Sequence, residues 1–93
     1  MFVIMKHIEI TVSGRVQGVG FRNSAKHQAR YLGIKGFVEN KMDGTVYIEA
    51  EGDDASLAEF VKWCRKGSTF SEVEGIQVIE GTLKHFGSFE TDY

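Results

Sequence analysis

The nine residues GRVQGVGFR at positions 14–22 lie between a segment with strand-like alternation and one with helical periodicity. Three glycines in seven positions are more than a simple connection needs, because each costs backbone entropy and is useful mainly where φ is positive or a ligand approaches. Successive N–H groups followed by a helix N-terminus make a nest for an anion, and Arg22 adds a planar charged fork suited to phosphate. Taken alone, the stretch is equally well a glycine-rich turn with a surface arginine.

The composition indicates one soluble, folded domain over residues 1–93, since a chain of 93 residues has room for a single hydrophobic core. A net charge of −2 argues against general polyanion binding, which depends on many Lys and Arg contacts. The single cysteine, Cys64, gives no sign of a disulfide framework, and charged residues interrupt the apolar start before a signal peptide or membrane span is complete. We therefore expect a cytoplasmic protein with no nucleic-acid or membrane partner.

The pattern of apolar residues predicts the order strand, helix, strand, strand, helix, strand. Strands are expected over residues 4–12, 34–40, 45–51 and 73–80, with a hairpin turn at 41–44 and a fifth strand over 83–90 at an edge. One helix is expected from Phe21 to Leu32, ended by Gly33. A second begins among the capping residues 53–56 and runs to about Lys66, ended by Gly67.

This order favours an α+β fold of the ferredoxin-like kind, an α/β sandwich of βαββαβ topology with a fifth strand. Two right-handed crossover connections place both helices on one face of an antiparallel sheet. The first two strands then run parallel with the third between them. The glycine loop, the N-terminus of the first helix and Asn40 at the end of the second strand should therefore converge at one edge.

The side chains expected at that edge offer limited chemistry. The loop matches neither the GxxxxGK phosphate loop nor the dinucleotide pattern. Cys64 lies on the apolar face of its helix, and the three histidines show no spacing typical of a metal site. An arginine, backbone amides and a carboxamide can still bind a phosphoryl group and orient a water. This suffices when the leaving group departs unaided, as the carboxylate of an acyl phosphate does.

Two stretches carry a resemblance to a known family. The loop GRVQGVGFR resembles the signature loop of the acylphosphatase family, and GFVENKMDGTV at 36–46 resembles its second signature. The resemblance implies a hydrolase that cleaves the carboxyl–phosphate bond of acyl phosphates without a metal or other cofactor. By position, Arg22 matches the family's phosphate-binding arginine, and Asn40 matches the asparagine that orients the attacking water. The backbone cradle of the phosphate corresponds to Gln17, Gly18, Val19, Gly20 and Phe21, together with Arg22.

The resemblance leaves some points open. Many members carry a basic or neutral residue where this chain has Glu39, which either points away from the site or weakens its attraction for anions. We expect a monomer whose partners are the small-molecule acyl phosphate and inorganic phosphate, as product or inhibitor. One alternative is a non-catalytic module that binds RNA or another anion, although the expected basic surface and aromatic pattern are missing. The other is a domain that binds or processes carbamoyl phosphate for a larger assembly.

Overall fold

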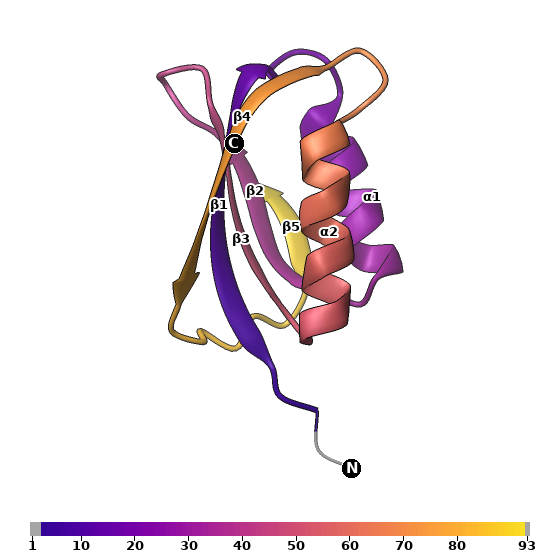
Figure 1. Ribbon diagram of the computed structural model, residues 1–93, viewed down its shortest axis with the longest axis vertical. Coiled ribbons are helices and arrows are strands. Elements are labelled where there is room, and N and C mark those ends of the chain that lie inside the picture. Colours follow the sequence, from indigo (N-terminus) through magenta and orange to yellow (C-terminus); the bar gives the residue numbers. More distant parts are fainter. Residues whose placement is uncertain (1–2, 93) are drawn as a thin grey trace.

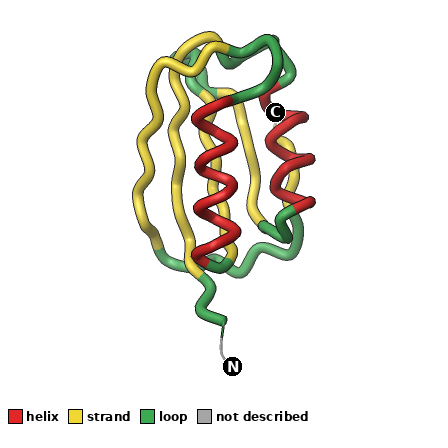
Figure 2. The backbone as a smooth tube through the Cα atoms, turned by 45° about the vertical axis from the view of Figure 1, so that its right-hand side comes forward, coloured by secondary structure: helices red, strands yellow, loops and turns green. Residues whose placement is uncertain are grey.

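A five-stranded sheet with both helices on one face makes up the computed structural model, which describes residues 3–92 (Figure 1). Along the chain the elements are β1 (Lys6–Arg15), α1 (Phe21–Tyr31), β2 (Lys35–Asn40), β3 (Val46–Gly52), α2 (Asp54–Lys66), β4 (Glu72–Gly81) and β5 (Phe89–Asp92). In the turned view of Figure 2 the two helices form one layer and the strands the other. The predicted ferredoxin-like sandwich is confirmed. No helix within residues 3–92 is long and apolar enough to cross a membrane.

The strands lie in the order β4-β1-β3-β2-β5. The ladders among β1, β2, β3 and β4 are antiparallel as predicted, whereas β5 runs parallel to β2, so the sheet is mixed. The fifth strand also begins at Phe89 and not near residue 83. The preceding segment crosses the end of the sheet from β4 toward β2, and the backbone N–H groups of Lys84 and Phe86 donate to Glu51 (Figure 1). The chain therefore enters β5 at the end where β2 also begins.

The first strand differs from its predicted limits at both ends. Ile4 is 72% exposed and precedes β1, so its place in the predicted alternation is wrong. At the other end, a shift in pairing between Ser13 and Gly14 allows β1 to continue to Arg15 against β4. A bulge of this kind adds twist and redirects the strand, which here leads into the glycine loop.

The core lies between the helices and the sheet. Helix α1 buries its predicted face through Phe21, Ala25 and Ala29, and α2 buries Leu57, Phe60 and Cys64. These side chains pack with buried sheet residues, among them Ile10, Val12, Val38 and Ile48. Burial raises the pKa of the Cys64 thiol to about 12, which agrees with a packing role for this cysteine.

Gly36 allows β2 to approach β3 closely. Its φ is +146°, and a Cβ at this position would meet the backbone carbonyl of Glu49. We expect Gly36→Ala to lower the free energy of unfolding by about 2 kcal/mol, since both strain and a backbone clash result. Urea denaturation measures this. Gly87→Ala is the control, because its Cβ meets no atom within 4 Å; equal losses in the two variants would contradict the explanation.

Candidate functional site

A pocket of about 160 Å³ lies where the loop after β1, the N-terminus of α1 and the ends of β2 and β5 meet. It is lined by Val16, Gly18, Gly20, Phe21, Arg22, Asn23, Asn40 and Thr91. The convergence expected from the topology is therefore present. The volume is below the roughly 300–1,000 Å³ of pockets for drug-sized ligands, and it suits a small anion.

The glycine loop gives this pocket one wall of backbone. Gly18 and Gly20 have φ values of +73° and +77°, in the left-handed region that side chains disfavour. Gly20 is the N-cap of α1 and supplies no side-chain cap, and the first turn of the helix contains no acidic residue. N–H groups at a helix N-terminus need acceptors, and the helix dipole favours a negative one. The sequence thus leaves this terminus suited to an anion.

Arg22 stands in the first turn of α1, half-buried, and lines the pocket. Its Nη1 donates to the carbonyl of Asp92, 3.1 Å away at the end of β5. A cation at a helix N-terminus is unfavourable unless acceptors or anions surround it. The contact with β5 holds the guanidinium beside the loop.

Asn40 is the last residue of β2, and it faces the helices because side chains alternate along the strand and Val38 is buried on that side. Its Oδ1 is shielded from solvent and accepts no hydrogen bond from any residue of 3–92. Buried polar atoms are nearly always satisfied, so one in a pocket indicates a place for a donor. The carboxamide is therefore available to hold a water or a substrate group.

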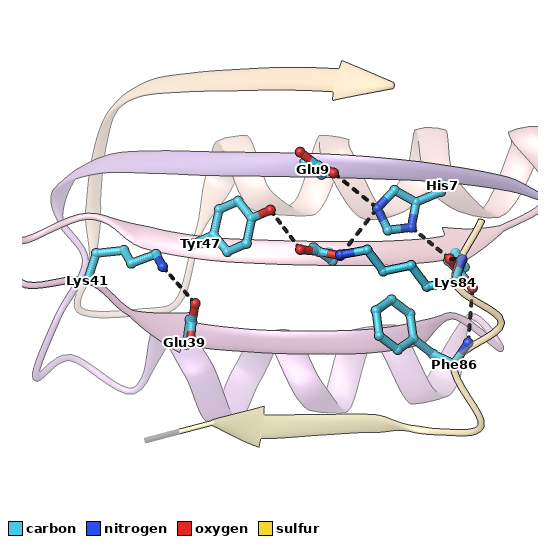
Figure 3. A network of polar contacts seen from close by, with 9 residues as sticks. His7, Glu9, Glu39, Lys41, Tyr47, Lys84 and Phe86 are labelled. Carbon is cyan, nitrogen blue, oxygen red and sulfur yellow. Dashed lines mark hydrogen bonds and ion pairs between the residues drawn. The ribbon is translucent and has the colours of Figure 1, made fainter. Parts of the chain in front are cut away.

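Glu39 points to the opposite face of the sheet. Its Oε1 lies 2.8 Å from Nζ of Lys41, which also lies 5.0 Å from the ring centroid of Tyr47 (Figure 3). The question left by the sequence is settled: the carboxylate is directed away from the pocket and is paired with a cation.

Gln17 and Val19, two of the predicted cradle residues, do not line the pocket. The Gln17 amide donates to the carbonyls of Lys41 and Thr45 at 2.7 and 2.8 Å, which ties the loop to the β2–β3 turn. Val19 packs against the core, and its carbonyl accepts from Ser68. A role of their backbone amides in binding phosphate stays a prediction.

Three lining residues were missed by the sequence analysis: Val16, Asn23 and Thr91. Val16 lies within the loop at 14–22 and Asn23 directly follows it, so their positions next to the predicted site residues could have indicated that they line the pocket. Thr91 comes from β5, paired with Val38. Nothing in the local pattern indicated that pairing.

The fold and the site together define a small ferredoxin-like sandwich with an anion-sized pocket at one edge of its sheet. The sequence model of the family described as Acylphosphatase matches residues 8–91. The acylphosphatase of Nocardioides sp. is 45% identical over 88% of this chain and 83% of its own length. The acylphosphatase of Archaeoglobus fulgidus is 44% identical over 92% of this chain and 97% of its own length.

A solved structure agrees with these relatives. The crystal structure of acylphosphatase from Bacillus subtilis superposes with a TM-score of 0.92 at 40% identity, and the match covers 97% of this chain and 100% of that one. The chain belongs to the acylphosphatase family of hydrolases.

Proposed function

We propose that this enzyme hydrolyses the carboxyl–phosphate bond of acyl phosphates to a carboxylate and inorganic phosphate, without a metal ion. In this proposal Arg22 and the backbone amides of residues 17–21 hold the phosphate, and Asn40 orients the attacking water. The observation that carries it is one pocket that joins the glycine loop, Arg22 and the buried Oδ1 of Asn40, an atom with no hydrogen-bond partner among residues 3–92.

Phosphate binding depends on complementary charge and fixed donors. The Arg22 guanidinium can donate two parallel hydrogen bonds to phosphate oxygens, while loop amides approach from the backbone. Donors that are held in position before the substrate binds stabilise the charge of the transferring phosphoryl group without reorganisation, and the contact of Arg22 with Asp92 supports such a role for the guanidinium.

The attacking water requires orientation more than activation. Oδ1 of Asn40 accepts a hydrogen bond from the water, whose oxygen forms the new bond to phosphorus as the bond to the acyl oxygen breaks. The residues that line the pocket include no carboxylate, imidazole or thiol. A phosphate oxygen of the substrate therefore takes the water's proton, as the family resemblance implies.

The leaving group needs little help. A carboxylate has a conjugate acid of pKa ~4, so it departs as an anion at neutral pH. A phosphate monoester would release an alkoxide, for which the pocket offers no general acid. This restricts the expected substrates to acyl phosphates, with esters hydrolysed far more slowly.

Hydrolysis of benzoyl phosphate in the presence of EDTA tests the proposal. We expect turnover well above the buffer rate, with competitive inhibition by inorganic phosphate. A phenyl phosphate ester serves as the matched control substrate and should be inert. Absence of benzoyl phosphate hydrolysis by a protein with a normal circular dichroism spectrum would rule the proposal out.

Gln17 is expected to position Asn40 through the β2–β3 turn. Gln17→Ala removes two hydrogen bonds to the turn that follows Asn40, and we expect kcat to fall about tenfold because the water is less well held. Inhibition by phosphate should change little. Gln77→Ala, in an exposed position of β4, is the control. If phosphate inhibition weakened in parallel with kcat, the Gln17 side chain would support the phosphate cradle and not the position of Asn40.

A further inference from the structure

A second polar cluster lies on the sheet face that the helices leave uncovered. It comprises His7 and Glu9 of β1, Glu49 and Glu51 of β3, and Lys84 of the segment before β5 (Figure 3). His7 is 1% exposed and Glu49 5%. The segment between β4 and β5 covers His7, and Phe86 of that segment stacks on its ring with centroids 6.1 Å apart.

Glu51 determines the tautomer of His7. Its Oε2 lies 2.7 Å from Nδ1 of His7, and the carboxylate also accepts from the backbone N–H groups of Lys84 and Phe86 at 2.6 and 3.1 Å. Both carboxylate oxygens of Glu51 therefore act as acceptors, Oε2 toward the backbone N–H of Lys84 and Oε1 toward that of Phe86. A carboxylate in this arrangement also accepts from the ring, so Nδ1 of His7 carries a proton.

The other ring nitrogen points at two further carboxylates. Nε2 of His7 lies 3.3 Å from Oε1 of Glu49 and 3.4 Å from Oε2 of Glu9, yet this buried atom makes no hydrogen bond to any described residue. The three side chains each bring a ligand atom to within 4.8 Å of the others. With the proton on Nδ1, a neutral imidazole would direct its lone pair at two anions. Such an arrangement calls for a cation between them.

Gly81 leaves room at this point. It pairs with His7 across the β1–β4 ladder, and a Cβ there would lie 2.8 Å from Cδ2 of His7 and 2.9 Å from Oε2 of Glu9. Any other residue would therefore press on the cluster. The glycine leaves this side of His7 and Glu9 free of a side chain.

We propose that Nε2 of His7 and the carboxylates of Glu9 and Glu49 bind one divalent transition metal ion, Zn²⁺ by preference, with water as the remaining ligand. One imidazole and two carboxylates are ligands that zinc accepts in four-coordinate sites. The Glu51–His7 contact is the typical arrangement behind a metal-bound histidine, where a carboxylate fixes the tautomer and raises the basicity of the ligating nitrogen.

This site is separate from the proposed catalytic pocket. His7 lies near the beginning of β1 and the glycine loop follows its end, about 23 Å away at ~3.3 Å per strand residue. The ion would link β1 to β3 on the uncovered face of the sheet. Its role is therefore structural, and hydrolysis in EDTA is expected to continue.

Lys84 is the internal competitor of the metal ion. Its Nζ lies 2.7 Å from Oε1 of Glu49, and its side chain is 53% exposed, so it can move into solvent when the ion binds. We expect Lys84→Gln to tighten zinc binding at least about tenfold, because a positive charge next to the ion is removed.

Calorimetric titration of the EDTA-stripped protein with ZnCl₂ in phosphate-free buffer tests the site. We expect one ion per chain in the wild type, loss of binding in Glu9→Gln and Glu49→Gln, and a loss of affinity of about 10–100-fold in Glu51→Gln. Glu9 is the safer ligand to replace, since its side chain is 34% exposed and folding should survive. Glu59→Gln, exposed on α2, is the control and should bind like the wild type.

Two measurements separate this site from the pocket. Co²⁺ should give the visible absorption of a four-coordinate ion in the wild type and not in Glu9→Gln, while benzoyl phosphate hydrolysis by Glu9→Gln stays at the wild-type rate. Zinc uptake that persists in both Glu9→Gln and Glu49→Gln would overturn the proposal. So would absence of zinc binding in both the wild type and Lys84→Gln.

Discussion

Arg22→Ala is expected to lower the turnover of benzoyl phosphate by about 10³-fold or more and to abolish inhibition by inorganic phosphate. The substitution removes the charged wall of the pocket and leaves the negative charge of the transition state to the loop amides alone. Arg22→Lys should recover only part of the loss, because an ammonium group retains the charge but not the fork that bonds two phosphate oxygens. Steady-state kinetics with phosphate as inhibitor measure both effects.

Arg30 provides a control for the structural part of this effect. Like Arg22 it lies on α1 and donates to a β5 carbonyl, that of Phe89 at 3.2 Å, and it pairs with Glu90. It does not line the pocket. Arg30→Ala therefore weakens the same helix–strand junction without touching the proposed site. Comparable losses of activity in the two alanine variants would show that Arg22 acts through the junction and not on the substrate.

Asn40→Ala should lower kcat by roughly 10²-fold, the scale of a lost preorganised polar group, with phosphate inhibition mostly intact. Its Oδ1 is the buried acceptor without a partner among residues 3–92, so its removal deprives the water of orientation but leaves the phosphate donors in place. Steady-state kinetics should therefore show a large fall in kcat and little change in the inhibition constant of inorganic phosphate.

Asn23→Ala is the matched comparison for Asn40, since this exposed carboxamide also lines the pocket. We expect it to change kcat less than threefold, because an exposed amide is not preorganised by its surroundings. If Asn40→Ala weakened phosphate inhibition as strongly as turnover, Asn40 would be a binding group and the assignment of the water would fail.

The convergence of the loop and Asn40 could be predicted because it depends on element order alone. Once β1 and β2 run parallel on either side of β3, their C-terminal ends share an edge whatever the details of packing. The direction of Glu39 depended only on whether Asn40 faces the helices, since neighbours on a strand alternate. The sequence alone did not indicate which side chain, Glu39 or Asn40, lies on the face that the helices cover.

The parts that the sequence did not predict depend on long-range contacts of one irregular segment. The Glu51 carboxylate accepts hydrogen bonds from the backbone N–H groups of Lys84 and Phe86, which are 33 and 35 positions away. These bonds hold the segment that leads into β5 and so help to determine where this strand begins. Local periodicity does not contain such information, so Thr91 was not assigned to the site. The same contacts bury His7, because alternation predicts the face of a side chain but not what covers that face.

The hydrogen bond between Arg22 and Asp92 also has a consequence for how the protein is made. Its two ends are 70 positions apart, so a chain leaving the ribosome completes the glycine loop and α1 long before the strand that holds the arginine exists. Contacts of such separation are costly to close and form late in folding. With Arg22 in its proposed role, hydrolysis by a nascent chain should therefore begin only after β5 has emerged and docked.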